Sequence, residues 1–349
     1  MNHTLSEIQN QPDKWRQTLT VTRSRWREIE SHFAVTPLTH FLFIGCGTSY
    51  YLAQSAARAF QQVTGCVATA VAASEVFLAG DSTIPRNVPV VAIPISRSGT
   101  TSEVLFAVTY LQQYHDHVKI LGLTCHEDHE LAAILPHSIS LGHAAEQSIV
   151  MTQSFTSMLL ALQFIAASIA QRDDLLAELE RLPDLMNDFM ASAEAFGRRV
   201  SQREGSGQYI FLGLGVYTGL AFEAMLKLKE MTQTPCEAYN PLEFRHGPIS
   251  IVDQKTAVIA LAGDEDLKYV TEVVSDIRGL GGYTWLMAPR QSVNVADETL
   301  SLPGGLSDWA RAILYMPALH YFAYHKAVGL GLNPDGPRHL DQVVVIQAQ

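Results

Sequence analysis

Short apolar runs alternate with amphipathic stretches along most of the chain, and this alternation is typical of α/β proteins with parallel sheets. In FLFIGCGTSYYLAQSAARAF, the apolar residues 41–44 predict a strand, GCG predicts a turn, and a helical pattern follows from Thr48. In VPVVAIPISRSGTTSEVLFAVTYL, residues 88–95 predict another strand, followed by a Ser/Thr-rich turn and a helix from near Glu103. The first part of the chain therefore consists of repeated strand, turn and helix units.

The same pattern continues and divides the chain into two similar halves. Further strands are predicted at residues 119–123 and 138–141, and a long apolar helix follows them. After a charged helical stretch and a Gly-Ser-Gly linker, the second series of predicted strands and helices lies at residues 208–212, 223–230, 256–261, 267–279, 284–287 and 306–330. A chain of 349 residues is long enough for two cores. We therefore predict a helical arm at residues 1–34 and α/β domains at residues 35–195 and 205–349.

The segment EAMLKLKEMTQTPCEAYNPLEFRHGP, residues 223–248, brings an acid, an amine and an imidazole into one stretch. Strong helix formers without Gly or Pro predict a helix for its first half. Glu223, Lys227 and Glu230 share one face of this helix, which we expect to point toward water while the apolar side packs on a sheet. Their spacing alone leaves two interpretations open: a solvated face with ion pairs, or a set of catalytic groups.

The second half of this segment, residues 237–248, is predicted to be a loop. Glu243, Arg245 and His246 crowd against its Gly-Pro turn. Loops that lie on a rigid scaffold often carry binding and catalytic residues. The loop therefore favours the catalytic interpretation of the charged helix that precedes it.

Two polar turns follow strands in the first half of the chain. GCGTS has Tyr50 where a dinucleotide fingerprint needs a third glycine, and it lacks the Gly-Lys of a P-loop. Thr48 and Ser49 are suited either to capping the next helix or to binding a ligand. The turn SRSGTT gathers four hydroxyls around Arg97, which suits a phosphate better than it suits an ordinary polar loop. Because open α/β sheets bind ligands at the carboxyl ends of their strands, we expect a phosphate group here.

Charge and composition narrow the possible partners. The net charge of -11 and the pI near 5.6 argue against nucleic acid or an anionic membrane as a partner. The first residues are polar and no apolar run approaches the length of about 20 residues that spans a bilayer, so a cytoplasmic location is expected. The cysteines lack CxxC spacing and HEDHE reads as an exposed loop, so we expect reduced thiols, no metal ion and no cofactor.

Five motifs then carry a resemblance to a known family: GCGTSY, SRSGTTSEV, AEQSIVMTQSFT, LKLKE…EAY…E…RHGP and NPDGPRHL. In these motifs and their order the chain resembles the tandem sugar isomerase (SIS) domain family. Within it, the chain resembles the isomerase half of glucosamine-6-phosphate synthase and stand-alone SIS-type glucosamine-6-phosphate deaminases. The resemblance implies two tandem SIS domains, each a mostly parallel sheet flanked by helices in a flavodoxin-like three-layer sandwich. It also implies a homodimer with a shared active site for a small sugar phosphate.

The resemblance further implies roles for individual residues. Glu230 would move a proton between C1 and C2 of the sugar, His246 would open the sugar ring from the neighbouring subunit, and Lys227 would be an active-site lysine on the same helix face as Glu230. Hydroxyl groups would hold the phosphate, and a Gly-rich turn would support the rest of the substrate. With Arg97, which adds its charge although the family has Gln there, the residues expected to bind the substrate or its phosphate are Cys46, Gly47, Thr48, Ser49, Ser96, Ser98, Thr101 and Ile149.

The residue types suit this chemistry. A 1,2-proton shift needs one positioned base that takes a proton from one carbon and returns it to the next, and a carboxylate can serve. Ring opening needs a group that moves a hydroxyl proton, for which an imidazole is suited. Lys227 is placed either to stabilise a developing enolate or simply to pair with Glu230.

Several departures from the family pattern steer the expected reaction. Arg97 stands where the family has Gln, Met151 replaces a binding-site Ser, and Gln342 aligns with the lysine associated with a Schiff base. The resemblance therefore does not carry a lysine-linked intermediate over to this chain. The chain begins Met1-Asn2 where the synthase has a glutamine-hydrolysing domain with a nucleophilic cysteine, so we expect no ammonia from glutamine.

Those departures favour the reaction that releases ammonia. We expect an aminosugar-6-phosphate deaminase that converts glucosamine 6-phosphate to fructose 6-phosphate and ammonia. The alternatives are an aldose-ketose phosphosugar isomerase, a fructosamine-6-phosphate deglycase and a non-catalytic phosphosugar sensor. The presence of both Glu230 and His246 speaks against the sensor.

Overall fold

The computed structural model describes residues 2–289, 295–344 and 346 and divides them into two compact units. The N-terminal unit holds residues 13–146 and 153–180 together with the described residues after 340. The C-terminal unit holds the described residues before 13, residues 147–152 and the described part of 181–340. The predicted arm at residues 1–34 is therefore shared between the two units, and residues 147–152 leave the N-terminal unit and return to it.

The N-terminal unit is built on a six-stranded parallel sheet with the order β2-β1-β3-β5-β6, in which β4 also pairs with β3. Its central strands are buried along nearly their whole length, as expected of apolar runs covered on both faces. The strands are β1 (His40–Gly45), β2 (Ala68–Ala72), β3 (Val90–Ser96), β4 (Val118–Ile120), β5 (Gly122–Thr124) and β6 (Ser138–Ser140).

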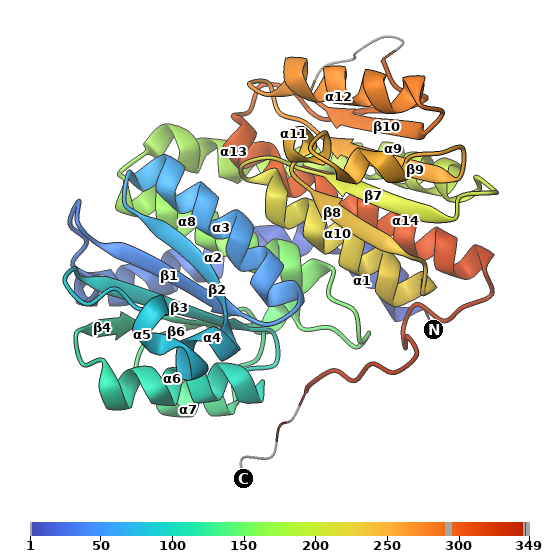
Figure 1. Cartoon of the computed structure of the whole chain (residues 1–349). Coiled ribbons are helices and arrows are strands. Elements are labelled where there is room, and N and C mark those ends of the chain that lie inside the picture. The colour runs from blue at the N-terminus through green and yellow to red at the C-terminus, as the bar shows by residue number, and fades with distance from the viewer. Residues whose placement is uncertain (1, 290–294, 345, 347–349) are drawn as a thin grey trace. The chain divides into compact units, whose positions relative to one another are not determined.

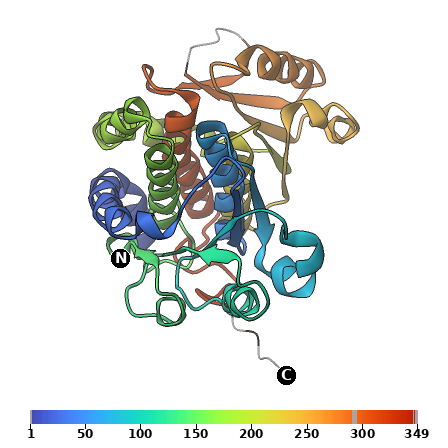
Figure 2. The ribbon, with the colours of Figure 1, turned by 90° about the vertical axis from the view of Figure 1, so that its left-hand side faces the viewer.

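Helices cover both faces of this sheet. Figures 1 and 2 show α3 and α8 alongside each other on one face, whereas α4 and α6 pack on the opposite face. Because α8 is apolar on nearly all sides, it is buried from residue 153 to residue 167. The helices are α2 (Gln11–Ile29), η1 (Glu30–His32), α3 (Thr48–Thr64), α4 (Ala73–Leu78), α5 (Gly80–Thr83), α6 (Ser102–Tyr114), α7 (Glu130–Ile134), η2 (Gly142–Ala144) and α8 (Gln153–Ile169).

The C-terminal unit has a five-stranded parallel sheet with the order β11-β10-β9-β7-β8. If β4 and β5 count as one interrupted strand, both sheets read 2-1-3-4-5 in chain order, which is the flavodoxin-like arrangement. The direction of winding then reverses between β1 and β3 in one unit and between β7 and β9 in the other. The strands are β7 (Gln208–Leu212), β8 (Cys236–Tyr239), β9 (Thr256–Leu261), β10 (Tyr283–Ala288) and β11 (Glu298–Ser301).

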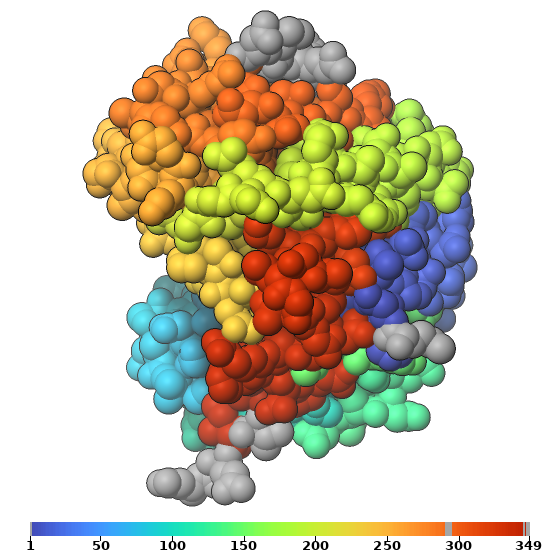
Figure 3. All heavy atoms as spheres, turned by 90° about the vertical axis from the view of Figure 1, so that its right-hand side faces the viewer, coloured from blue at the N-terminus to red at the C-terminus, as the bar shows by residue number. Residues whose placement is uncertain are grey.

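In this unit α10 and α14 pack together on one face of the sheet and α12 covers the other, which gives three layers (Figure 1). Figure 3 shows the second half of α9 as a yellow-green band beside α14, and Lys326 of α14 joins the two helices by donating to the carbonyl of Ser201, the last residue of α9, at 3.3 Å. No helix among the described residues is long and apolar enough to cross a membrane. The helices are α1 (His3–Gln9), α9 (Asp173–Ser201, shared between the units), α10 (Tyr217–Thr232), α11 (Pro241–Phe244), η3 (Pro248–Ile251), α12 (Leu267–Gly279), α13 (Asp308–Arg311), η4 (Ala312–Tyr315) and α14 (Met316–Gly329).

The structure confirms the predicted fold class and corrects several local predictions. The loop predicted at residues 237–248 is wrong, because it contains most of β8 and all of α11. Strands β2 and β11 lie at the sheet edges and were not predicted. The helix face with Glu223 and Lys227 does not point into water, since both side chains are buried.

Candidate active site

The turn after β1 places polar groups at the switch point of the N-terminal sheet. A Cβ on Gly45 would lie 2.5 Å from the Ser49 backbone, so only glycine allows the turn to close this tightly. Gly47, with φ of 53°, occupies the N-cap position of α3 without a side-chain cap. Thr48 and Ser49 therefore do not cap the helix, and they form its buried first turn.

Cys46 in this turn is a half-buried thiol. Burial, joined by the nearby Glu103 carboxylate and opposed by a backbone hydrogen bond, raises its pKa to about 11. The thiol is therefore protonated near neutral pH and unsuited to act as a nucleophile. Its place beside Gly47 fits the predicted supporting role better than a covalent one.

The neighbouring turn, after β3, gathers hydroxyl groups. The Ser96 hydroxyl accepts the Gly99 N–H at 3.0 Å and lies 2.9 Å from the Thr101 hydroxyl. The Ser98 hydroxyl accepts from the N–H and the hydroxyl of Thr100, at 3.2 and 3.0 Å. These groups stand at the start of α6, where free backbone N–H groups and the helix dipole favour an anion. The turn thus has the groups that an anion-binding loop needs, and its binding of a phosphate remains a prediction.

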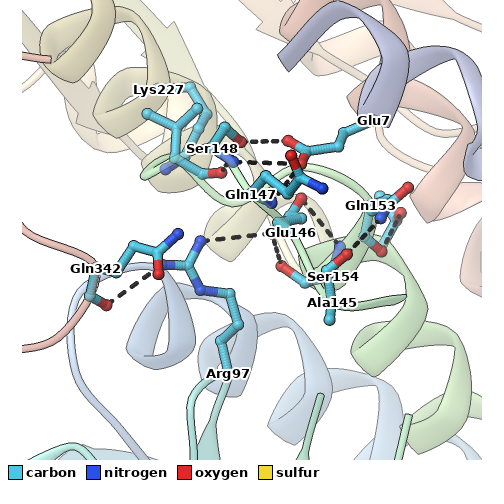
Figure 4. Close-up of polar contacts among 12 residues, drawn as sticks. Glu7, Arg97, Ala145, Glu146, Gln147, Ser148, Gln153, Ser154, Lys227 and Gln342 are labelled. Carbon is cyan, nitrogen blue, oxygen red and sulfur yellow. Dashed lines mark hydrogen bonds and ion pairs between the residues drawn. The ribbon is translucent and has the colours of Figure 1, made fainter. Parts of the chain in front are cut away.

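Arg97 supplies the positive charge of this turn and is almost fully buried (Figure 4). Its Nη1 lies 3.5 Å from the Glu146 carboxylate, and its Nη2 donates to the Gln342 carbonyl at 3.3 Å. The Glu146 side chain is fully buried and accepts from both the N–H and the hydroxyl of Ser154, at the start of α8. Glu146 therefore anchors the guanidinium group. It was not among the predicted site residues, although it lies in the motif AEQSIVMTQSFT.

A second charged cluster lies on α10 in the C-terminal unit. Lys227 Nζ lies 2.5 Å from a Glu230 carboxylate oxygen and 3.4 Å from a Glu223 carboxylate oxygen. Glu223 and Lys227 are buried, whereas the Glu230 side chain keeps 18% of its surface exposed. A buried ammonium group needs such partners, because an isolated charge in the interior is costly. The cluster therefore presents one reachable carboxylate, backed by a fixed cation.

His320 on α14 belongs to the same unit and is completely buried. Burial, together with the positive charge of Lys227, lowers its pKa to about 3. The imidazole is therefore neutral near pH 7 and adds no charge to the α10 cluster. Its Nδ1 lies 3.5 Å from the Gln11 side-chain amide.

The other two predicted site residues of this unit lie outside the α10 cluster. His246 follows α11 with an exposed side chain, and its N–H donates to the Glu243 carbonyl at 2.9 Å. Ile149 lies in residues 147–152 and donates its N–H to the Asp335 carbonyl at 3.0 Å. The structure therefore joins Lys227 and Glu230 directly, but it does not bring His246 into contact with them through a described hydrogen bond or ion pair.

Residues 147–152 are also held by the N-terminal helix α1. The Glu7 carboxylate accepts the Gln147 N–H at 2.6 Å, and it accepts both the N–H and the hydroxyl of Ser148 (Figure 4). Glu7 is itself buried. Glu7 was not predicted from the sequence, and it fixes the backbone next to Ile149.

The HEDHE segment has a structural role in the N-terminal unit. The Nδ1 of His129 accepts the Ala132 N–H at 3.0 Å and so caps α7. Within the described residues, no three His, Cys, Asp or Glu side chains are grouped so as to hold a metal ion. That the chain needs no metal ion or cofactor remains a prediction.

Comparison with known proteins adds to this geometry. The SIS domain family matches residues 38–168 and 205–301. The chain is 25% identical to the isomerizing glutamine–fructose-6-phosphate aminotransferase of Methanothermobacter thermautotrophicus over 98% of its length, but spans only 57% of that relative. Among solved structures, the glucosamine-6-phosphate deaminase of Thermotoga maritima has a TM-score of 0.79 and 28% identity, over 99% of this chain and 100% of that one. The tagatose-6-phosphate ketose/aldose isomerase of Escherichia coli has a TM-score of 0.86 at 23% identity, over 99% and 96%, and so shares the fold.

Proposed function

Because this chain belongs to the SIS domain family, we propose that it moves a proton between C1 and C2 of a hexose 6-phosphate, and that its reaction is the deamination of glucosamine 6-phosphate. The observation that carries the proposal is the α10 cluster, in which Glu230 is the partly exposed carboxylate of an otherwise buried group. A base for a carbon acid needs this combination of access and fixed orientation. The similarity to the Thermotoga maritima deaminase over the whole of both chains favours deamination.

The substrate phosphate is assigned to the N-terminal unit. Ser96, Ser98 and Thr101 offer hydroxyl groups at the start of α6, and Ser49 lies in the first turn of α3. Arg97 adds a positive charge in the same turn. Two helix N-termini, hydroxyl groups and a guanidinium group are the groups that bind a phosphate dianion well.

The chemical steps are assigned to His246 and Glu230. In the proposed reaction, His246 moves the proton of the O1 hydroxyl to the ring oxygen, which opens the ring. Glu230 takes the proton from C2 while O1 takes one from water, which gives an enaminol. Glu230 then returns a proton to C1 and the nitrogen loses one to water, which leaves an imine at C2. Water adds to the imine and ammonia leaves, so the product is fructose 6-phosphate. Lys227, whose ammonium group lies 2.5 Å from the Glu230 carboxylate, is proposed to orient this base.

His246 is proposed to act on the substrate bound to a neighbouring copy of the chain. Its imidazole is exposed and separate from the α10 cluster, as a residue that completes a second subunit's site would be. This assignment makes the enzyme a homodimer with shared sites. Ile149 and the turn from Cys46 to Thr48 are proposed to line the rest of the substrate.

One assay separates the deaminase from its alternatives. The protein is incubated with glucosamine 6-phosphate, and ammonia and fructose 6-phosphate are followed together, with heat-treated protein as the blank. The proposal predicts both products in equal amounts. If the protein instead interconverts other hexose 6-phosphates without producing ammonia, it is an isomerase. If it releases the bound amine, and not ammonia, from an N-substituted fructosamine 6-phosphate, it is a deglycase. If it binds a sugar phosphate without converting it, it is a sensor.

A further inference from the structure

The C-terminal sheet has its own switch point, between β7 and β9, and the turn after β9 already holds an anion. The N–H groups of Asp264 and Glu265 donate to the two oxygens of the Asp308 carboxylate, at 2.9 and 3.3 Å. Asp308 lies 44 residues beyond Asp264, at the start of α13. Two consecutive backbone N–H groups that bind two oxygens of one anion are the geometry of an oxyanion cradle.

Gly263 shows that the turn is shaped around this carboxylate. A Cβ at position 263 would lie 2.2 Å from an Asp308 oxygen and 2.4 Å from its carboxyl carbon. Only glycine therefore lets the anion approach the backbone this closely. The Gly263 N–H donates to Asp266 at 2.6 Å, so carboxylates accept all three N–H groups of residues 263–265.

Arg311 completes the cradle as its counter-charge. Its guanidinium group is almost fully buried and lies 2.7 Å from Asp308 and 3.1 Å from Asp264. It also donates to the carbonyls of Pro303 and Leu306, at 3.1 and 2.5 Å. Backbone N–H groups plus a buried arginine are the partners that a bound phosphate would have.

The equivalent turn of the N-terminal unit, after β3, instead carries hydroxyl side chains and no carboxylate of its own, with Ser98 half-buried at its surface. We propose that the Asp308 carboxylate is an internal anion that fills the oxyanion cradle of the C-terminal unit, so that the chain binds one sugar phosphate and not two. Removal of this carboxylate then opens a site for a small oxyanion such as inorganic phosphate. The count of one rests on the proposed function, whereas the internal anion rests on the turn itself.

Equilibrium dialysis with radiolabelled inorganic phosphate tests the proposal on the full chain. We expect one phosphate per chain for the wild type and two for Asp308→Ala. Asp308→Asn is the matched control, because its amide keeps the volume of the side chain, and it should bind one. If the wild type binds no phosphate and Asp308→Ala binds one phosphate per chain, the internal anion is supported and the phosphate site of the proposed function is contradicted. Equal numbers for the wild type and Asp308→Ala would overturn the internal anion alone.

Chemical rescue provides a second measurement, which does not depend on phosphate binding by the N-terminal unit. Acetate should raise the melting temperature of Asp308→Ala by several degrees more than that of the wild type, because it replaces the lost carboxylate. Asp276→Ala, which removes an exposed carboxylate paired with Arg245, should show no such gain. If Asp308→Ala is insoluble, Asp308→Ser is refolded with and without acetate, and recovery that depends on acetate supports the proposal. Equal acetate effects on all variants, or no recovery in acetate, would overturn it.

Discussion

Lys227 lies 2.5 Å from Glu230 on the next turn of α10, and its ammonium group is also 3.4 Å from Glu223. One buried cation is thus shared by two carboxylates, of which only Glu230 reaches the surface. The arrangement orients the proposed base without taking up both of its oxygens. It also makes the stability of α10 depend on the same residues as the proposed chemistry.

Lys227→Met should destabilise the protein and remove activity together. The substitution leaves the buried Glu223 carboxylate without its cation, and breaking a buried pair in this way costs about 3 kcal/mol or more. Urea denaturation measures the loss. The double variant Glu223→Gln, Lys227→Met should recover most of the stability while remaining inactive. A Lys227→Met protein as stable as the wild type would show that the pair does not matter for folding.

Asp266→Asn should stabilise the protein at neutral pH but not in mild acid. Burial, joined by the Asp308 charge and opposed by the Gly263 hydrogen bond, raises the pKa of Asp266 to about 6. The pKa of Asp266 in the folded protein lies above its unfolded value of 3.8. Asp266 therefore contributes to the free energy of unfolding fully below the unfolded pKa, and this contribution is lost as pH rises through about 6.

The measurement is the melting temperature of the wild type and of Asp266→Asn between about pH 4 and pH 8. The asparagine is always neutral and can still accept the Gly263 N–H, so its advantage should appear as pH rises through the pKa of Asp266. The same difference in melting temperature at every pH would contradict this assignment.

Arg97→Gln should weaken substrate binding with little effect on the rate at saturation. A charge-assisted hydrogen bond to phosphate is replaced by a neutral one, which is worth about tenfold in KM. Arg97→Lys keeps the positive charge but loses the forked guanidinium group that spans Glu146 and the Gln342 carbonyl. Its KM should therefore lie between those of the wild type and Arg97→Gln. Steady-state kinetics with glucosamine 6-phosphate measure both. A fall in kcat at unchanged KM would move Arg97 from phosphate binding to the chemical step.

Mixing two inactive variants should restore activity if His246 acts in a neighbouring subunit. In a hybrid dimer of Glu230→Gln and His246→Asn, one site has both substitutions and the other has neither. Co-refolded mixtures should therefore recover part of the wild-type rate, whereas each variant alone should not. If the mixture stays inactive although hybrid dimers form, His246 acts within its own chain or not at all.

Much of the fold could be predicted from the sequence because buried parallel strands are continuous apolar runs. β7, β9 and α12 have the predicted bounds, and both sheets follow from the repeated units. Three of the four edge strands, β2, β8 and β11, were missed because they carry weak signals, whereas the edge strand β6 was predicted. β8 reads CEAY and is half exposed, so its pairing with β7, and not its composition, makes it a strand. The short turn of α11 begins at Pro241 and was hidden by the same polar context.

Parts of the candidate site could be predicted from the sequence where the type of residue at a given position indicates its chemical role. The hydroxyl-rich turn after β3 and the pair of Lys227 and Glu230 are of this kind. Burial was not predictable, because the spacing of Glu223, Lys227 and Glu230 is the same on a wet helix and on a buried one. Glu146 and Asp308 act on turns that are distant in the sequence, so only the fold reveals their roles.

The proposal that Glu230 transfers the carbon-bound proton is tested by hydrogen isotope exchange. Glucosamine 6-phosphate is turned over in deuterium oxide, and deuterium at C1 of the product is measured by NMR for the wild type and for Glu230→Gln, with substrate binding measured in parallel. We expect deuterium at C1 of the product for the wild type. For Glu230→Gln we expect no turnover and no exchange, although the variant binds the substrate nearly normally. Exchange or turnover by Glu230→Gln at a rate near that of the wild type would contradict the proposal.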